Sequence, residues 1–188
     1  AGDVNILNLV EMDQLAGEIR TLVLNKVGEV SGHVGPNLGV AELTIAFHHV
    51  FDSPKDKIVW DVSHQSYPHK ILTDRKHGFV DKENFDSVTG YTSQHESEHD
   101  FFTVGHTSTS ISLAVGMAKA RDLKKETGNV VALIGDGSLS GGLAFEGLNN
   151  AAELGANLII IVNDNEMSID ENFGGLYRSL AELRATNG

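Results

Sequence analysis

The sequence predicts an α/β fold in which a parallel sheet carries helices on both faces. Three short apolar runs, at 57–61, 130–134 and 158–162, have the composition of buried strands, and longer segments of helical periodicity separate them. This alternation is typical of a parallel sheet covered on both sides. Right-handed crossovers bring the carboxyl ends of parallel strands to one edge, so we expect the residues that follow the three runs to share one rim.

The first half of the chain supplies two helices and the first strand. Residues 11–30 and 42–47 carry apolar side chains at helical spacing, and a loop with three glycines and one proline, at 31–39, separates them. His64 lies just beyond the strand at 57–61. Residues 74–103 show the least periodicity and many charges, which is typical of either a functional loop or a disordered surface segment.

The second half supplies three helices and two strands. One helix opens at the hydroxyl-rich segment 105–110, whose side chains we expect to cap it and to face a phosphate. Ser138 or Ser140 is predicted to cap the next helix, which runs to about residue 154. The apolar positions of that helix are Leu143, Phe145, Leu148 and Ala152. A short helix is expected at 176–183.

Composition limits the classes of function. The 188 residues suffice for one domain, and 26 acidic against 14 basic side chains give a formal net charge of −12. That balance argues against a nucleic-acid-binding protein. No apolar run approaches the ~20 residues of a membrane-spanning helix, and the first residues lack a signal-peptide pattern, so we expect a cytoplasmic protein. The absence of cysteine excludes disulfides and thiolate metal sites.

Oxygen-bearing side chains follow the second and third strands. Asp136 lies within Gly-Asp-Gly, and Asn165 ends an Asn-Asp-Asn segment. The two strands belong to one βαβ unit, so Asp136 and Asn165 should be neighbours. Their oxygens suit Mg²⁺, and the helix N-terminus after Gly137 suits a diphosphate. Either motif alone could be an ordinary turn or polar loop, but their combination predicts a site for metal and diphosphate.

Three histidines lie at element junctions expected on this rim, namely His33, His64 and His106. The unperturbed pKa of imidazole is about 6.5, which is close to neutral pH. These side chains can therefore donate to a diphosphate or move protons on a sugar hydroxyl. Glu146, one turn past the glycine loop, fits a structural or subunit-facing carboxylate as well as a general base, and we leave it out of the catalytic set. We interpret five other histidines as surface or core residues: His48, His49, His69, His77 and His99.

The stretch 135–176 resembles the thiamine diphosphate-binding motif, in which GDG is followed by an Asn-rich strand end. The longer sequence pattern of this stretch is more similar to 1-deoxy-D-xylulose-5-phosphate synthases than to transketolases at large. It reads GDG..GG.AFE.LNNA and NDNEMSI.EN.G.L. Three further segments resemble the same family: SGH at 31–33, WDVSHQ with YPHK at 60–70, and GHTSTSIS at 105–112. The resemblance implies the thiamine diphosphate-binding (transketolase-like) fold.

The resemblance also implies two cofactors, thiamine diphosphate and Mg²⁺, and assigns residues to them. The metal ligands would be Asp136, Asn165 and the carbonyl oxygen of Met167. The residues that bind thiamine diphosphate would be His64, Gly105, His106, Thr107, Asp136, Gly137, Ser138 and Asn165. His33 and His64 are the catalytic candidates, and His33 would assist proton transfer.

The reaction that the resemblance implies is a transferase reaction. Pyruvate would condense with glyceraldehyde 3-phosphate, with loss of CO₂, to give 1-deoxy-D-xylulose 5-phosphate for isoprenoid, thiamine and pyridoxal synthesis. An alternative is a split or divergent transketolase, which moves a two-carbon ketol unit between sugar phosphates. An alternative of another class is a non-catalytic subunit that only binds the cofactor.

The resemblance covers the front part of one diphosphate-binding domain, over residues 1–188. We expect the pyrimidine-binding and C-terminal domains of the family, with the activating glutamate, to lie outside this chain. This segment alone should therefore be inactive and should need the remainder of the enzyme, in the same or another chain, together with a homodimeric partner.

Three positions depart from the synthase pattern. Pro36 replaces a serine, Ser63 replaces the glycine of WDVGHQ, and Gln94-His95 stands where the synthases usually carry an arginine-containing segment. Arginine is suited to bidentate phosphate recognition, so its loss could change the donor or the acceptor.

Overall fold

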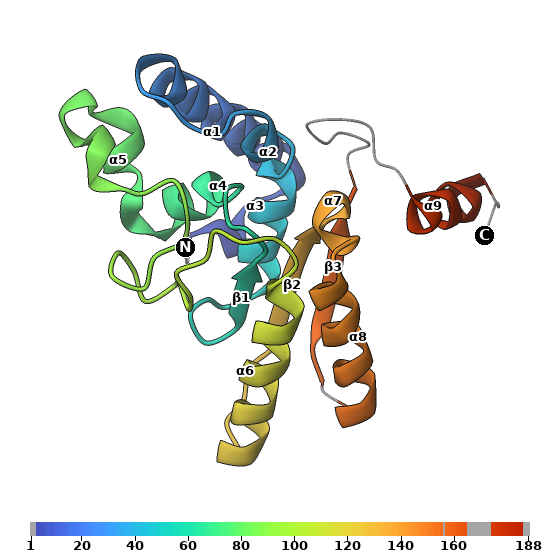
Figure 1. Cartoon of the computed structure of the whole chain (residues 1–188). Helices are drawn as coiled ribbons and strands as arrows, with labels where there is room; N and C mark the ends of the chain where they lie inside the picture. The colour runs from blue at the N-terminus through green and yellow to red at the C-terminus, as the bar shows by residue number, and fades with distance from the viewer. Residues whose placement is uncertain (1–2, 156, 165–173, 186–188) are drawn as a thin grey trace.

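The computed structural model describes residues 3–155, 157–164 and 174–185, and it contains the expected parallel sheet. The sheet has three strands in the order β1-β2-β3, namely β1 (Lys57–Trp60), β2 (Val130–Gly135) and β3 (Ile159–Asn163). Trp60 lies opposite Leu133, and Gly135 lies opposite Asn163. All three strands therefore end at one edge, as the sequence predicted (Figure 1).

Helices pack on both faces of this sheet, which confirms the predicted fold class (Figure 1). Alternate strand residues point to opposite faces. Val59, Ala132 and Ile134 pack with α6 (Ser110–Lys124) and α8 (Gly142–Leu154). On the other face, Ile58, Trp60, Val131 and Leu133 pack with Phe47 of α3 (Ala41–Val50).

The N-terminal helices form a second core beside the sheet. α1 (Leu9–Glu29) begins with a capping box, in which the Asn8 side chain accepts from the backbone of Glu11 and the Glu11 carboxylate accepts from the backbone of Asn8. Ile19 and Val23 of α1 pack against Ile45 of α3. The remaining elements before β2 are η1 (Val4–Ile6), α2 (Gly35–Leu38), α4 (Tyr67–Lys70), a π-turn η2 (Ile71–Arg75), α5 (His77–Val80) and η3 (Lys82–Ser87).

The predicted serine and threonine caps are wrong. The segment after β2 forms two helices, α7 (Asp136–Leu139) and α8, and their N-caps are the glycines Gly135 and Gly141 without side-chain caps. The N-cap of α6 is Thr109, which also makes no side-chain cap. The carboxylate of Asp61 instead accepts from the backbone N–H groups of Ser108 and Ser110, at 2.9 Å each. A side chain at the end of β1 thus replaces a local cap.

One burial prediction is also wrong, and the buried face of α8 differs from its apolar positions. We expected the third strand to be buried, but Ile159 and Val162 of β3 are 39% and 41% exposed, because β3 is the edge of the described sheet. In α8, Leu143 and Phe145 are exposed, and the residues buried against α6 are small, namely Ala144 and Gly147. A Cβ on Gly147 would lie 3.0 Å from Ile111, so the close approach of the two helices selects glycine there.

The helix at the end of the described chain, α9 (Gly175–Ala185), agrees with the helix expected at 176–183. Within the described ranges, no helix has both the length and the apolar character needed to span a membrane.

Residues 74–103, which the sequence allowed to be either a functional loop or a disordered segment, are ordered by buried charged side chains. Lys26 of α1 donates to the carbonyl oxygens of Gly78 and Phe85 at 2.9 and 2.7 Å, which holds α5 and η3 against α1. Arg75 donates to both carboxylate oxygens of Asp100, at 2.6 and 2.9 Å. A bidentate, charge-assisted pair of this kind is among the strongest polar contacts in proteins.

Asp100 also anchors two buried histidines, which confirms that His48 and His69 are core residues. The Asp100 carboxylate accepts from Nε2 of His69 at 3.2 Å, and this fixes the tautomer of His69 because a carboxylate cannot donate. Nδ1 of His69 then accepts from Nε2 of His48 at 2.9 Å. Burial lowers the pKa of His48 to about 2 and lowers the pKa of His69. Both rings are therefore neutral at neutral pH, and His69 and Asp100 form a hydrogen bond, not a salt bridge.

The buried histidines predict a loss of stability in mild acid. Below a pH of about 6.5, the unfolded chain protonates His48 and His69, whereas the folded chain does not, so unfolding becomes more favourable as the pH falls. We expect a loss of about 2 kcal/mol in the free energy of unfolding between roughly pH 6.5 and 5.5, measured by urea titration. Replacing His48 with glutamine should flatten this dependence, and an unchanged slope would contradict the assignment.

Candidate functional site

The rim of the sheet brings His33 and His64 together. His33 precedes α2, His64 follows β1, and their ring centroids are 5.4 Å apart in an edge-to-face arrangement. The buried amide of Asn37 joins their backbones, because its Nδ2 donates to the carbonyl oxygens of His33 and His64 at 2.7 and 2.8 Å. Its Oδ1 accepts from the backbone of Tyr67 at 2.8 Å. Both amide N–H donors of Asn37 thus hold the backbones of His33 and His64, and its oxygen holds that of Tyr67.

Each of these two rings carries a buried nitrogen for which the described structure shows no hydrogen-bond partner. Nδ1 of His33 and Nδ1 of His64 are buried and have no hydrogen-bond partner within the described residues. Unpaired buried polar atoms are costly in folded proteins, and they are common where a ligand completes the site. Burial, together with the neighbouring His33, lowers the pKa of His64, which keeps that ring neutral at neutral pH.

The hydroxyl-rich segment before α6 meets the glycine loop after β2. The Ser108 hydroxyl donates to the carbonyl oxygen of Ser138 at 2.6 Å, and a Cβ on Gly141 would collide with the Ser108 side chain. The backbone N–H of Ser108 is held by Asp61, at the end of β1. Residues 105–107, which we predicted to contact the diphosphate, therefore lie in a loop that is tied to both strands.

His106 differs from the other two rim histidines. Its side chain and that of Thr107 are exposed, and within the described residues no ring contact joins His106 to His33 or His64. The carbonyl oxygen of His106 accepts from the Thr109 hydroxyl at 3.1 Å. The local structure of His106 is thus a turn before α6, and the histidine cluster of this rim consists of two rings.

Asp136 lies at the end of β2, where we predicted a metal ligand. It is the first residue of α7 and is buried, and Gly137 and Ser138 follow it in the same short helix. The Tyr177 hydroxyl of α9 donates to the carbonyl oxygen of Asp136 at 3.2 Å. Because Gly135 pairs with Asn163, β3 ends beside Asp136, as expected.

The other predicted metal ligands, Asn165 and Met167, lie outside the described residues. Among the residues that the structure describes, no group of three or more acidic or histidine side chains is arranged to hold a metal ion.

Sequence reasoning missed three residues of this rim. Asn37 and Asp61 hold the backbone of the site, and Tyr91 packs its ring edge-to-face on His33 with centroids 5.4 Å apart. Asp61 lies inside a segment that we matched to a known family, whereas Asn37 lies in the loop at 31–39, and the polarity of their positions was the available signal. Tyr91 lies in the least periodic part of the chain, where no pattern pointed to it.

Comparison with known proteins identifies the family. A family model described as 1-deoxy-D-xylulose-5-phosphate synthase matches residues 1–188. The chain belongs to this family. It is 54% identical over 182 residues to the 1-deoxy-D-xylulose-5-phosphate synthase of Desulforudis audaxviator, and 55% identical over 174 residues to that of Symbiobacterium thermophilum. These matches cover 97% and 93% of the chain, but only 29% and 27% of the two relatives.

Solved transketolases share the fold of this synthase-family chain. The transketolase of Campylobacter jejuni superposes with a TM-score of 0.74 at 20% identity, over 95% of this chain and 32% of the transketolase chain. A transketolase from Pichia stipitis superposes with a TM-score of 0.67 at 24% identity, over 85% and 28% of the two chains. The transketolase-like fold that the sequence predicted is therefore confirmed.

The structure accounts for two of the three departures from the synthase pattern. Ser63 has φ = 69°, in the left-handed region that glycine adopts most easily. Its hydroxyl donates to the carbonyl oxygen of Val104 at 3.0 Å and accepts from the backbone N–H of Thr92 at 2.9 Å, and these contacts offset the strain. Pro36 lies in the first turn of α2, where its missing N–H costs nothing. Gln94 and His95 are exposed.

Proposed function

We propose that this chain is the thiamine diphosphate-binding part of a 1-deoxy-D-xylulose-5-phosphate synthase, which condenses pyruvate with glyceraldehyde 3-phosphate and releases CO₂. The observation that carries the proposal is the His33–His64 pair with its two unpaired buried nitrogens, set at the same rim as Asp136. Its support from the comparisons is the family match along the whole chain. Since the chain spans less than a third of its relatives, the rest of the enzyme is required for turnover.

The residues present fit thiamine diphosphate. The turn 135–138 offers backbone N–H groups beside a buried carboxylate, and the segment 105–107 is tied to it through Ser108. Backbone N–H groups at a helix N-terminus stabilise an anion such as a diphosphate, and the carboxylate stabilises its counter-cation. When bound, the cofactor supplies the nucleophilic carbon and the electron sink for decarboxylation.

We assign the residues the following roles. His64 donates a hydrogen bond to the cofactor or to its substrate, and His33 holds and moves a proton at a substrate oxygen, since neutral imidazole can act as either donor or acceptor. Gly105, His106, Thr107, Gly137 and Ser138 contact the diphosphate. Asp136, Asn165 and the carbonyl oxygen of Met167 would hold Mg²⁺, because oxygen ligands suit that ion. We further propose a homodimer in the cytoplasm.

A product assay on the complete enzyme tests this function. We expect CO₂ release from pyruvate, with thiamine diphosphate and Mg²⁺ added, to rise when glyceraldehyde 3-phosphate is supplied, and a deoxyxylulose phosphate to appear by mass spectrometry. Ketol transfer from a ketose phosphate, without pyruvate decarboxylation, would overturn the synthase and favour a transketolase. Cofactor binding without either reaction would indicate a non-catalytic binding protein.

A further inference from the structure

Tyr91 occupies a defined place in the site although no motif contains it. Its ring packs edge-to-face on His33, at a centroid distance of 5.4 Å and an interplanar angle of 66°. A Cβ placed on Gly105 would lie 3.9 Å from the Tyr91 ring. Tyr91 thus lies between a catalytic candidate and the segment proposed to contact the diphosphate.

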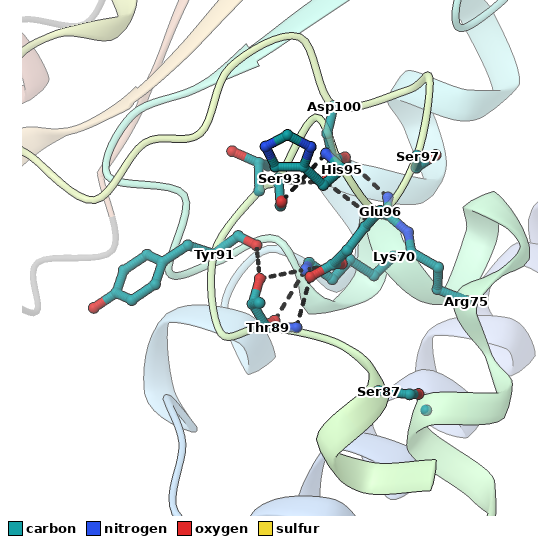
Figure 2. Close-up of polar contacts among 12 residues, drawn as sticks. Lys70, Arg75, Ser87, Thr89, Tyr91, Ser93, His95, Glu96, Ser97 and Asp100 are labelled. Atoms are coloured by element: carbon teal, nitrogen blue, oxygen red, sulfur yellow. Dashed lines mark hydrogen bonds and ion pairs between the residues drawn. The ribbon is translucent and has the colours of Figure 1, made fainter.

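A buried clamp fixes the backbone that carries this ring. Lys70, which is 0% exposed, donates to the Glu96 carboxylate at 2.6 Å and to the carbonyl oxygen of Thr89 at 2.9 Å. The other Glu96 oxygen accepts from the backbone N–H of Thr89 at 2.7 Å. The Thr89 hydroxyl donates to the carbonyl oxygen of Tyr91 at 2.7 Å (Figure 2). The position of Tyr91 is therefore set by a lysine that cannot reach solvent.

The clamp holds the Tyr91 backbone and leaves the phenol free. Figure 2 shows the side chain pointing away from Lys70, Thr89 and Glu96. The phenol makes no hydrogen bond within the described residues, and Tyr91 is 36% exposed. A tyrosine hydroxyl that is held in a site but has no partner there is a ready donor to a ligand oxygen.

We propose that Tyr91 is a substrate-contact and positioning residue, whose ring edge orients His33 and whose hydroxyl donates to an anionic oxygen of a bound substrate. That oxygen belongs to the carboxylate of a keto acid or to the phosphate of an aldehyde acceptor, and the two share the chemistry of a charged acceptor. The identity of these substrates rests on the proposed function, whereas the contact with His33 does not. The loop that carries Tyr91 thereby takes part in substrate selection.

Two substitutions in the complete enzyme separate the hydroxyl from the ring. Tyr91→Phe removes only the hydrogen-bond donor. We expect the KM of one substrate to rise roughly tenfold, because the loss of a hydrogen bond to a charged group has about this effect on binding. The kcat and the thiamine diphosphate affinity should stay near the wild-type values. A rise for pyruvate assigns the hydroxyl to the keto acid, and a rise for glyceraldehyde 3-phosphate assigns it to the acceptor. Both KM values within twofold of wild type would overturn the donor role.

The ring is tested without turnover. Tyr91→Ala removes the aromatic cover of His33, so we expect diethyl pyrocarbonate to modify His33 several-fold faster, measured by peptide mass spectrometry, while Tyr91→Phe keeps the wild-type rate. An unchanged rate in Tyr91→Ala would overturn the contact, whether or not pyruvate is a substrate. Thr103→Val, which removes an exposed hydroxyl from the same loop, is the matched control and should change none of these quantities.

Discussion

Replacing Asp100 with alanine should lower the free energy of unfolding by about 3–5 kcal/mol, the range for breaking a buried ion pair from one side. Although burial alone would raise its pKa, hydrogen bonds from His69 and Arg75 hold the pKa of the Asp100 carboxyl well below its usual range. Without the carboxylate, the buried Arg75 cation has no bidentate partner and His69 loses its acceptor. Urea titration of the complete protein, followed by circular dichroism, measures the change.

Two variants make this result interpretable. Glu98→Ala removes an exposed carboxylate two residues away in the same loop and should change stability by less than about 0.5 kcal/mol. Asp100→Asn keeps the shape of the side chain but not its charge, so its effect should approach that of the alanine variant if Arg75 is the main partner. A loss below about 1 kcal/mol in Asp100→Ala would show that the network adds little to the fold.

The second large effect is expected at the proposed metal site. Asp136→Ala should weaken Mg²⁺-dependent binding of thiamine diphosphate by more than about 100-fold. The substitution removes a carboxylate ligand of the proposed metal site, and this carboxylate is the only acid of the turn 135–138. Isothermal titration calorimetry on the complete enzyme, with Mg²⁺ and with a chelator, measures the affinity. The fold of the unliganded variant should stay largely intact, which circular dichroism would show.

A second acidic residue serves as the control for the effect of removing one negative charge. Glu153→Ala removes an exposed carboxylate from the far end of α8 and should leave the affinity unchanged. If thiamine diphosphate bound equally well in chelator and in Asp136→Ala, the metal assignment would be wrong, while the proposed reaction would still have to be judged by its own product assay.

The order of the elements and the rim could be derived from the residues because both depend on local patterns and on one topological rule. The apolar runs became β1, β2 and β3, and parallel crossovers placed His64, Asp136 and Asn163 at one edge. The glycine turn after β2 also carried enough local information to locate the diphosphate-binding candidate.

The supports of the site depend on residues far apart in the chain, and no periodicity encodes such contacts. Asp61 caps α6 across 47 and 49 positions, where the hydroxyl groups of the segment itself predicted local caps. Asn37 reaches His64, 27 positions away, and so joins it to His33. Lysine is rarely buried without a partner, yet Lys70 lies buried because Glu96, 26 positions away, provides its counter-charge.

Tyr91 illustrates the same division. Its loop lacks any repeating apolar pattern, so nothing local distinguishes an ordered, site-forming segment from a surface excursion. Tertiary structure decided the matter, since the buried Lys70 and Arg75 must find partners, and those partners, Glu96 and Asp100, lie in this loop. The contacts that satisfy these buried charges therefore also position Tyr91 against His33.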